Sequence, residues 1–193
     1  MFIKDWKKEI FTIPNLLSLF RLALLPLYVE IYLAAEEARE YLLAGSIMAV
    51  SCLTDAIDGK IARKFNMISN VGKLLDPLAD KITQFTLTLC LSLKYPVLNP
   101  VLGLFLVKEI FQLVAVIVNL RKGKALPGAL MAGKVCTTVL FVSLIMLVLF
   151  PNLDPLLVEL IALVDTVFLT IAFISYILAY FGKHRKVQDM EQT

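Results

Sequence analysis

Four aspartates in a strongly apolar chain are the residues best suited to chemistry. Asp55 and Asp58 are three positions apart, and Asp76 and Asp80 are four positions apart. On helices, both spacings place two carboxylates on one face. If the two helices are joined by a short loop and run antiparallel, the four carboxylates converge. Four negative charges in a partly dehydrated site require cations or large pKa shifts.

Divalent cations are the simplest way to balance such a site, since two of them offset four carboxylates. Ligation by oxygen alone favours Mg²⁺, Mn²⁺ or Ca²⁺ over zinc. A pair of cations suits phosphoryl transfer, because it can stabilise both the attacking and the leaving oxygen. Transporters also place carboxylates within the membrane, so the aspartates alone do not separate an enzyme from a cation pathway.

The residues after Asp58 favour a phosphate-bearing ligand. Gly59 removes a side chain where a ligand could approach the backbone, and Ala62 keeps the next turn clear. Arg63 supplies a planar fork that suits phosphate. Taken singly, Gly59 could be a packing residue and Arg63 a topology anchor. Their placement together beside the aspartates indicates a substrate site.

The elements that must position these residues are membrane helices. The chain has 193 residues, of which 59% are hydrophobic and 18% charged. A bilayer-spanning helix needs about 20 mostly apolar residues, and backbone groups in lipid must be satisfied within the helix. We predict an all-α integral membrane protein, with one domain over residues 1–193 and no room for a separate soluble domain. The six predicted transmembrane helices cover residues 13–34, 41–59, 74–93, 97–119, 127–150 and 155–181.

Basic residues predict the orientation of these helices. Most of the 19 Lys and Arg residues lie in the two terminal segments and in the loops on the same side of the membrane as the termini. Only Arg39 and Lys94 lie in the loops on the opposite side. Cytoplasmic loops are enriched in Lys and Arg. Both termini, and the four aspartates, are therefore expected on the cytoplasmic side.

The terminal segments are predicted to lie outside the spans. Phe2, Trp6 and Ile10 recur at four-residue intervals in residues 1–12, which is typical of a short amphipathic helix in the headgroup region. A charged lead-in that only sets topology would fit equally well. Residues 182–193 are expected to form a basic cytoplasmic tail.

Two classes of site are disfavoured by charge and cysteine usage. The net charge is only +3 and no basic arm is present, so nucleic-acid binding is not expected. Cys52, Cys90 and Cys136 are isolated in apolar stretches, which favours buried, reduced residues over a disulfide or thiolate metal site.

The aspartate region as a whole resembles the signature of the CDP-alcohol phosphatidyltransferase family. Residues 55–80 match DxxDGxxAR(x8)GxxxDxxxD at every defining position, and the length and span count are also similar to the family's. The resemblance implies a membrane enzyme that transfers a phosphatidyl group from CDP-diacylglycerol to an alcohol and releases CMP. It also implies two divalent cations, Mg²⁺ or Mn²⁺, and a homodimer among membrane lipids, in a bacterial plasma membrane with the active site on the cytoplasmic side.

The resemblance also implies roles for individual residues. Asp55, Asp58 and Asp76 correspond to metal ligands. Asp80 corresponds to a ligand or neighbour of the metals and to the general base that deprotonates the acceptor hydroxyl. The residues expected to bound the CDP pocket are Asp58, Gly59, Ala62, Arg63 and Gly72, with Arg63 contacting phosphate.

The acceptor is predicted from weaker features. Residues 13–21 and 75–81 resemble the phosphatidylglycerophosphate synthase branch, which uses sn-glycerol 3-phosphate. A phosphorylated acceptor needs cationic residues, for which Lys134, Arg121 and Lys108 are the candidates. That branch often reads GKxKT where this chain has Gly133 to Thr137, with Cys136 in place of a lysine. The acceptor could therefore instead be phosphatidylglycerol, as in cardiolipin synthases of the family, or inositol phosphate.

Each basic candidate also has a simpler structural role. Lys134 could be a side chain that snorkels to the membrane surface, and Arg121 a topology anchor. Lys108 and Glu109 could form a structural ion pair. Three further substrate-site candidates are Asn15, Arg21 and Lys81; the first two could instead cap and anchor the first helix.

Overall fold

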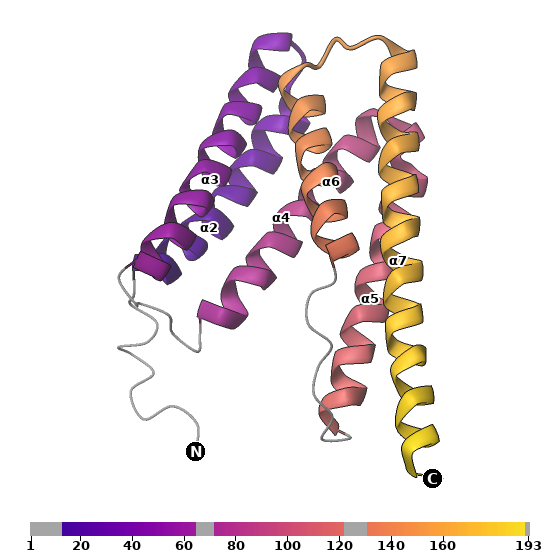
Figure 1. Ribbon diagram of the computed structural model, residues 1–193. Helices are drawn as coiled ribbons and strands as arrows, with labels where there is room; N and C mark the ends of the chain where they lie inside the picture. Colours follow the sequence, from indigo (N-terminus) through magenta and orange to yellow (C-terminus); the bar gives the residue numbers. More distant parts are fainter. Residues whose placement is uncertain (1–12, 65–71, 122–130, 192–193) are drawn as a thin grey trace. The chain divides into compact units, whose positions relative to one another are not determined.

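The computed structural model describes residues 13–64, 72–121 and 131–191 (Figure 1). Within these ranges, the side chains of residues 13–14, 53–64, 73–74, 120 and 181–191 are outside the description as well. The predicted interfacial helix over residues 1–12 falls outside the described residues.

The described part of every predicted apolar stretch is helical, and no strand occurs in the described ranges, which confirms the all-α class. The 3-10 helix η1 (Pro96–Leu98) precedes α5. The last helix continues well past the predicted span, because residues 183–191 contain no Gly or Pro and are rich in good helix formers. The helices are α2 (Ile13–Ala34), α3 (Ala38–Lys64), α4 (Gly72–Lys94), α5 (Asn99–Arg121), α6 (Met131–Leu149) and α7 (Pro155–Glu191).

Among the residues whose side chains the structure describes, which leave out 53–64 of α3, four segments are long and apolar enough to cross a membrane. They are Asn15–Ala34, Pro96–Asn119, Met131–Leu149 and Pro155–Tyr180. Neither α3 nor α4, the helices that carry the aspartates, is among them; in α4 the charged residues Asp80, Lys81 and Lys94 lower the mean hydropathy. Six spans and cytoplasmic termini therefore stay predictions.

The chain divides into two compact units. Unit 1 comprises residues 1–93 and 144–153, and unit 2 comprises residues 94–143 and 154–193. Unit 1 thus holds α2, α3, α4 and the end of α6, whereas unit 2 holds η1, α5, the first part of α6 and α7.

In unit 1, α2 and α3 form an antiparallel helical hairpin. Tyr28 and Tyr32 stack on α2 with ring centroids 5.5 Å apart, and Tyr32 meets the edge of Tyr41 from α3 at 5.3 Å. The connection is closed by Glu40, whose carboxylate accepts the backbone N–H groups of Glu36 at 2.7 Å and Glu37 at 3.2 Å. This arrangement resembles half of a capping box. The two donors lower the pKa of Glu40 below its ordinary value.

In unit 2, aromatic residues join the helices. Phe111 of α5 meets Phe173 of α7 edge to face at 5.4 Å and Tyr180 at 6.2 Å. Gly133 of α6 lies directly against Tyr176 of α7, since a Cβ atom at this glycine would approach the ring carbons to 2.9 Å. The absence of a side chain at Gly133 is what permits this contact.

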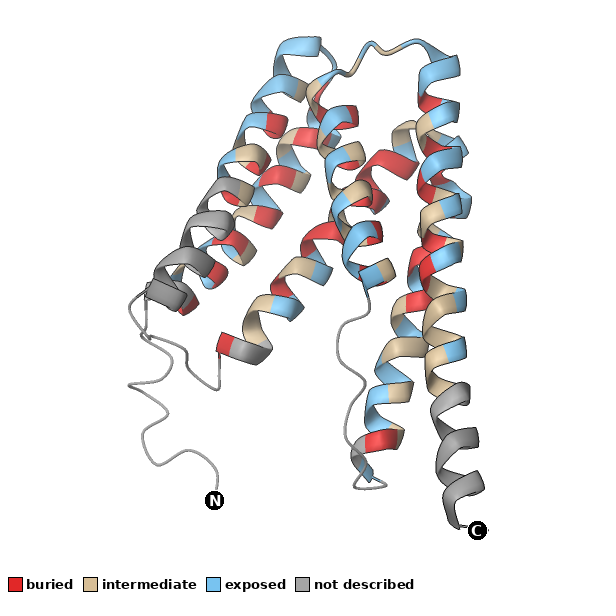
Figure 2. Ribbon diagram, viewed as in Figure 1, coloured by how far each residue is buried: buried red, intermediate tan, exposed pale blue. Residues whose placement is uncertain are grey.

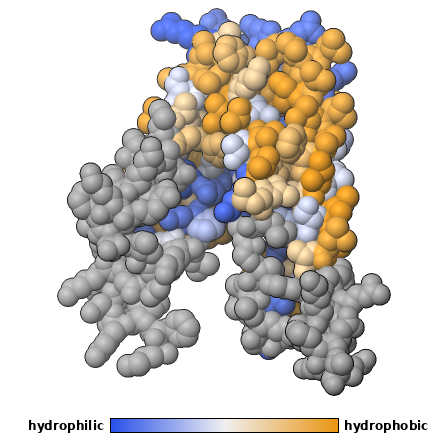
Figure 3. All heavy atoms as spheres, viewed as in Figure 1, coloured by the Kyte–Doolittle hydropathy of each residue, from blue (hydrophilic) through white to orange (hydrophobic). Residues whose placement is uncertain are grey.

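Large apolar side chains remain exposed on every described α-helix, as expected for surfaces that face lipid. Examples are Leu33, Leu43, Leu93, Ile110 and Leu178. Figure 2 shows buried and exposed residues interspersed along the helices. Figure 3 shows apolar side chains over most of the visible described surface, with hydrophilic residues along its upper edge. An apolar exterior of this extent fits a lipid environment rather than water.

Candidate functional site

The four aspartates lie at neighbouring ends of two consecutive helices of unit 1. Asp55 and Asp58 fall near the end of α3, and Asp76 and Asp80 in the first turns of α4. The side chains of Asp55, Asp58, Gly59, Ala62 and Arg63 lie outside the described residues. Gly72 begins α4 and is buried.

At the beginning of α2, one face of the helix carries polar side chains that are buried in the interior of unit 1. Asn15, Ser18 and Arg21 are spaced three residues apart, and none is more than 1% exposed. Leu25 and Tyr28 continue the same buried face as apolar groups. Burying polar side chains in so apolar a chain is costly unless they find polar partners. The partners of these side chains therefore identify the polar groups in the interior of this end of unit 1.

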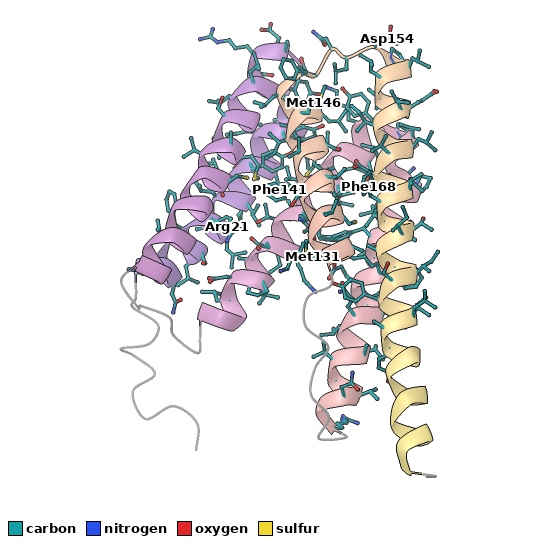
Figure 4. All side chains as sticks on the ribbon, viewed as in Figure 1. Arg21, Met131, Phe141, Met146, Asp154 and Phe168 are labelled. Atoms are coloured by element: carbon teal, nitrogen blue, oxygen red, sulfur yellow. The ribbon has the colours of Figure 1, made fainter. Side chains whose placement is uncertain are left out.

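Two of these partners are the aspartates of α4. The Ser18 hydroxyl donates to Asp76 Oδ1 at 2.6 Å. The Arg21 guanidinium donates to Asp80 Oδ1 and forms an ion pair with it. Arg21 lies on the α4 side of α2, where it is labelled in Figure 4. Since both residue numbers rise together in the two contacts, α2 and α4 run parallel in this region.

The two carboxylates differ in their surroundings. Asp76 is partly buried and its described partner, Ser18, is neutral. The side chain of Asp80 is 47% exposed, and its partner is a buried cation. Arg21, predicted as a substrate-site candidate, is thus held directly beside an aspartate. Lys81, the next residue along α4, is exposed.

The donor set of α4 fits a hard divalent cation. Carboxylate oxygens are the ligands that Mg²⁺ and Mn²⁺ prefer, and both Asp76 and Asp80 keep Oδ2 in addition to the bonded Oδ1. Among the described residues, no group of three or more His, Cys, Asp or Glu side chains surrounds one metal position. Asp55 and Asp58, the other two predicted ligands, are outside that set.

In unit 2 the three acceptor candidates differ sharply in exposure. Lys108 is 4% exposed, pairs with Glu109 at 2.7 Å, and lies 5.7 Å from the centroid of the Phe105 ring. Lys134, in the first turn of α6, and Arg121, at the end of α5, are both exposed. The positive charge of Lys108 is therefore already compensated by Glu109, whereas Lys134 and Arg121 can reach a ligand from outside.

The segment around Lys134 is shaped by packing. Gly133 admits Tyr176, and the Thr137 hydroxyl donates to the Gly133 carbonyl. Cys136, where the related pattern has lysine, is 1% exposed. A lysine there would need a partner for a buried charge.

Ser18 and Asp165 are buried polar residues that were not among the candidates predicted from the sequence. Ser18 could have been found from its three-residue spacing to Asn15 and Arg21. Asp165 of α7 is 1% exposed within an apolar span, close to the Ser143 hydroxyl, and an acidic residue in such a span is itself a signal. Together with the buried Lys108, paired with Glu109, and the buried Asn119, Asp165 gives unit 2 polar groups in its own interior.

Comparison with known proteins places the chain in a family. The model of the CDP-alcohol phosphatidyltransferase family matches residues 11–179. The CDP-diacylglycerol–glycerol-3-phosphate 3-phosphatidyltransferase of Aquifex aeolicus is 35% identical over 176 residues, which are 88% of this chain and 96% of the relative. The Bacillus subtilis protein of the same name is 42% identical over 83 residues, which are 37% of this chain and 43% of the relative.

A relative with another name is also similar. The CMP-forming cardiolipin synthase of Streptomyces coelicolor is 34% identical over 135 residues, which are 67% of this chain and 61% of the relative. The family match covers most of the chain, including all four aspartates and the three basic acceptor candidates of unit 2. The chain therefore belongs to the CDP-alcohol phosphatidyltransferase family and is an enzyme of that class.

Proposed function

We propose that this enzyme transfers the phosphatidyl group of CDP-diacylglycerol to sn-glycerol 3-phosphate, forming phosphatidylglycerophosphate and CMP. The observation that carries the proposal is the similarity over 88% of the chain to a relative named for this reaction. Lys134 and Arg121 support it, because two exposed basic residues suit an acceptor that brings its own phosphate.

Asp55, Asp58, Asp76 and Asp80 would hold two divalent cations, Mg²⁺ or Mn²⁺. When bound, such cations supply positive charge to the pyrophosphate of CDP-diacylglycerol. Asp80 takes the proton from the acceptor hydroxyl as its oxygen attacks the phosphorus that bears diacylglycerol. The new P–O bond replaces the bond to the CMP oxygen, and CMP leaves with the electron pair. Asp80 suits the role of base because its side chain is about half-exposed.

The remaining assignments follow the motif. Asp58, Gly59, Ala62, Arg63 and Gly72 bound the CDP pocket, with Arg63 on phosphate. Asn15 supports this end of α2 from its buried position, and Lys81 is available to substrate from its exposed one.

At the acceptor, Lys134 and Arg121 bind the phosphate, and Lys108 contributes less because Glu109 already neutralises it. In the cell we expect a single-domain homodimer in the bacterial plasma membrane, with its six spans and its active site oriented toward the cytoplasm.

A second acceptor, phosphatidylglycerol, is favoured by one observation. Relatives named cardiolipin synthase match the chain, and Cys136 stands where a lysine is common in the glycerol-3-phosphate branch. The chemistry at the aspartates would be unchanged.

The test is CMP release by purified protein in detergent with CDP-diacylglycerol and Mg²⁺. Parallel reactions receive glycerol 3-phosphate, phosphatidylglycerol, inositol phosphate or no acceptor. We expect release that depends on glycerol 3-phosphate, together with phosphatidylglycerophosphate as the lipid product. Release with phosphatidylglycerol alone would assign the second acceptor instead, and release with none of the acceptors would refute both.

A further inference from the structure

The hydroxyl of Ser18 reaches from one helix to a carboxylate of another. Ser18 is fully buried on α2, and its donor–acceptor distance to Asp76 Oδ1, on α4, is 2.6 Å. That distance is typical of a hydroxyl bonded to an ionised carboxylate, which is a stronger bond than one between neutral groups.

Several other helical hydroxyls of the described residues bond within their own helix. Ser46, Ser92 and Ser175 each donate to a backbone carbonyl three or four residues earlier in their own helix. Such local bonds satisfy the hydroxyl without linking helices. Ser18 instead spans 58 positions of sequence to reach Asp76. Its bond therefore fixes the position of a particular carboxylate.

The bond leaves the negative charge of Asp76 intact. A serine hydroxyl is neutral, and it occupies one lone pair of Oδ1 while Oδ2 stays available. At Asp80, by contrast, the Arg21 guanidinium brings a full positive charge. Of the two α4 carboxylates, Asp76 is thus held firmly without being neutralised, which is what a cation ligand needs.

We propose that Ser18 is a positioning residue of the metal site, and that its hydroxyl holds Asp76 in the orientation in which it takes up a divalent cation. This inference rests on the proposed function, which makes Asp76 a metal ligand. Partners that orient metal ligands generally influence affinity strongly: their loss costs about 10–100-fold in metal affinity or activity.

The experiment measures Mn²⁺ binding to purified protein in detergent, with free Mn²⁺ followed by electron paramagnetic resonance. We expect Ser18→Ala to bind Mn²⁺ about 10-fold more weakly than the wild type or worse. Ser18→Thr, which keeps the hydroxyl, should restore most of the affinity. Ser46→Ala is the matched control, because it removes a helical hydroxyl that bonds only the Leu42 carbonyl, and it should bind as the wild type does.

Thermal unfolding without metal separates positioning from folding. If Ser18→Ala does not fold, Ser18→Cys keeps the size of the side chain with a weaker donor and should show the same loss of Mn²⁺ affinity. A folded variant without the hydroxyl that binds Mn²⁺ as tightly as the wild type would overturn the proposal.

Asp76→Asn distinguishes this failure from failure of the proposed function. If Asp76→Asn weakens Mn²⁺ binding while Ser18→Ala does not, the metal assignment stands and only the role of Ser18 is wrong. If Asp76→Asn binds normally, Asp76 is not a ligand, and both proposals lose their metal site. The double variant should bind no more weakly than Asp76→Asn alone, and a further loss would show that Ser18 acts by another route.

Discussion

Gly133→Ala tests the contact between α6 and α7 in unit 2. A Cβ atom at this position would come within 2.9 Å of the Tyr176 ring carbons, and closer still to its hydroxyl. The rigid ring has to move as a whole, and overpacking of this kind costs about 1–3 kcal/mol. Replacing helical Gly by Ala returns about 1 kcal/mol. The net expectation is a loss of up to about 2 kcal/mol in the free energy of unfolding.

Gly103→Ala is the matched control, since no atom lies within 4 Å of a Cβ built there. It should gain about 1 kcal/mol from helix propensity alone. For a chain of this size, Gly103→Ala should raise Tm by roughly 2–4 °C, whereas Gly133→Ala should lower it by up to about 8 °C. Unfolding can be followed with a thiol-reactive fluorophore, because Cys90 and Cys136 are buried in the native protein and react once exposed.

Tyr176→Phe provides the coupling test. It removes the atom nearest to the glycine, so the double variant with Gly133→Ala should lose less stability than the sum of the two single losses. Coupling between contacting residues is typically about 0.5–3 kcal/mol. If Gly133→Ala were as stable as Gly103→Ala, or if the two changes simply added, Tyr176 would not lie against Gly133.

Three further outcomes are expected. Asp80→Asn should lower kcat by about 100-fold or more, the usual contribution of a general base. It should also lower Tm, because the buried Arg21 guanidinium loses its counter-charge; undiminished CMP release would exclude Asp80 as the base. Lys134→Ala should raise KM for glycerol 3-phosphate by more than it raises KM for CDP-diacylglycerol, whereas Arg39→Ala, an exposed control, should raise neither; equal increases for Lys134→Ala would remove it from the acceptor site. The pKa of Glu40 is lowered in the folded protein. The Glu40 carboxylate should therefore stabilise the start of α3 fully when the pH is above 4.5, the ordinary pKa of the group, and this stabilisation should be lost as the pH falls through the lowered pKa. Amide hydrogen exchange at Glu36 and Glu37 between pH 3 and about 6 measures this, and protection that persists in Glu40→Gln with an unchanged pH dependence would contradict it.

Sequence patterns predicted helix positions well because lipid leaves few alternatives for an apolar backbone. The bounds of α2 match the predicted stretch at both ends, and the α4 and α5 bounds differ from the predicted ones by no more than two residues. The predicted last span agrees with the apolar segment Pro155–Tyr180, and α7 continues beyond it because Lys, Arg, Gln and Glu all sustain a helix in water.

Contacts between helices were harder to predict, since spacing tells which residues share a face but not what that face meets. Asn15 and Arg21 stood out by residue type, yet the pairing of Arg21 with Asp80 and of Ser18 with Asp76 depends on how α2 packs beside α4. Lys108 and Lys134 were equivalent acceptor candidates in the sequence, since each is a lysine in an apolar stretch. The structure distinguishes them, because Lys108 is buried and paired with Glu109.

The ion pair between Arg21 and Asp80 also imposes an order on biosynthesis. Fifty-nine positions separate the two residues, so the ribosome needs roughly 3–12 s at ordinary elongation rates to make the partner after the arginine. When α2 first enters the bilayer, its arginine has no Asp80 to pair with, and a centrally placed arginine costs about 2.5–3.5 kcal/mol on insertion scales. Because Arg21 lies in the first half of α2, its guanidinium can stay near the membrane surface until α4 has been made. The arrival of α4 supplies Asp80, so the burial of Arg21 between the packed helices depends on a residue made 59 positions later.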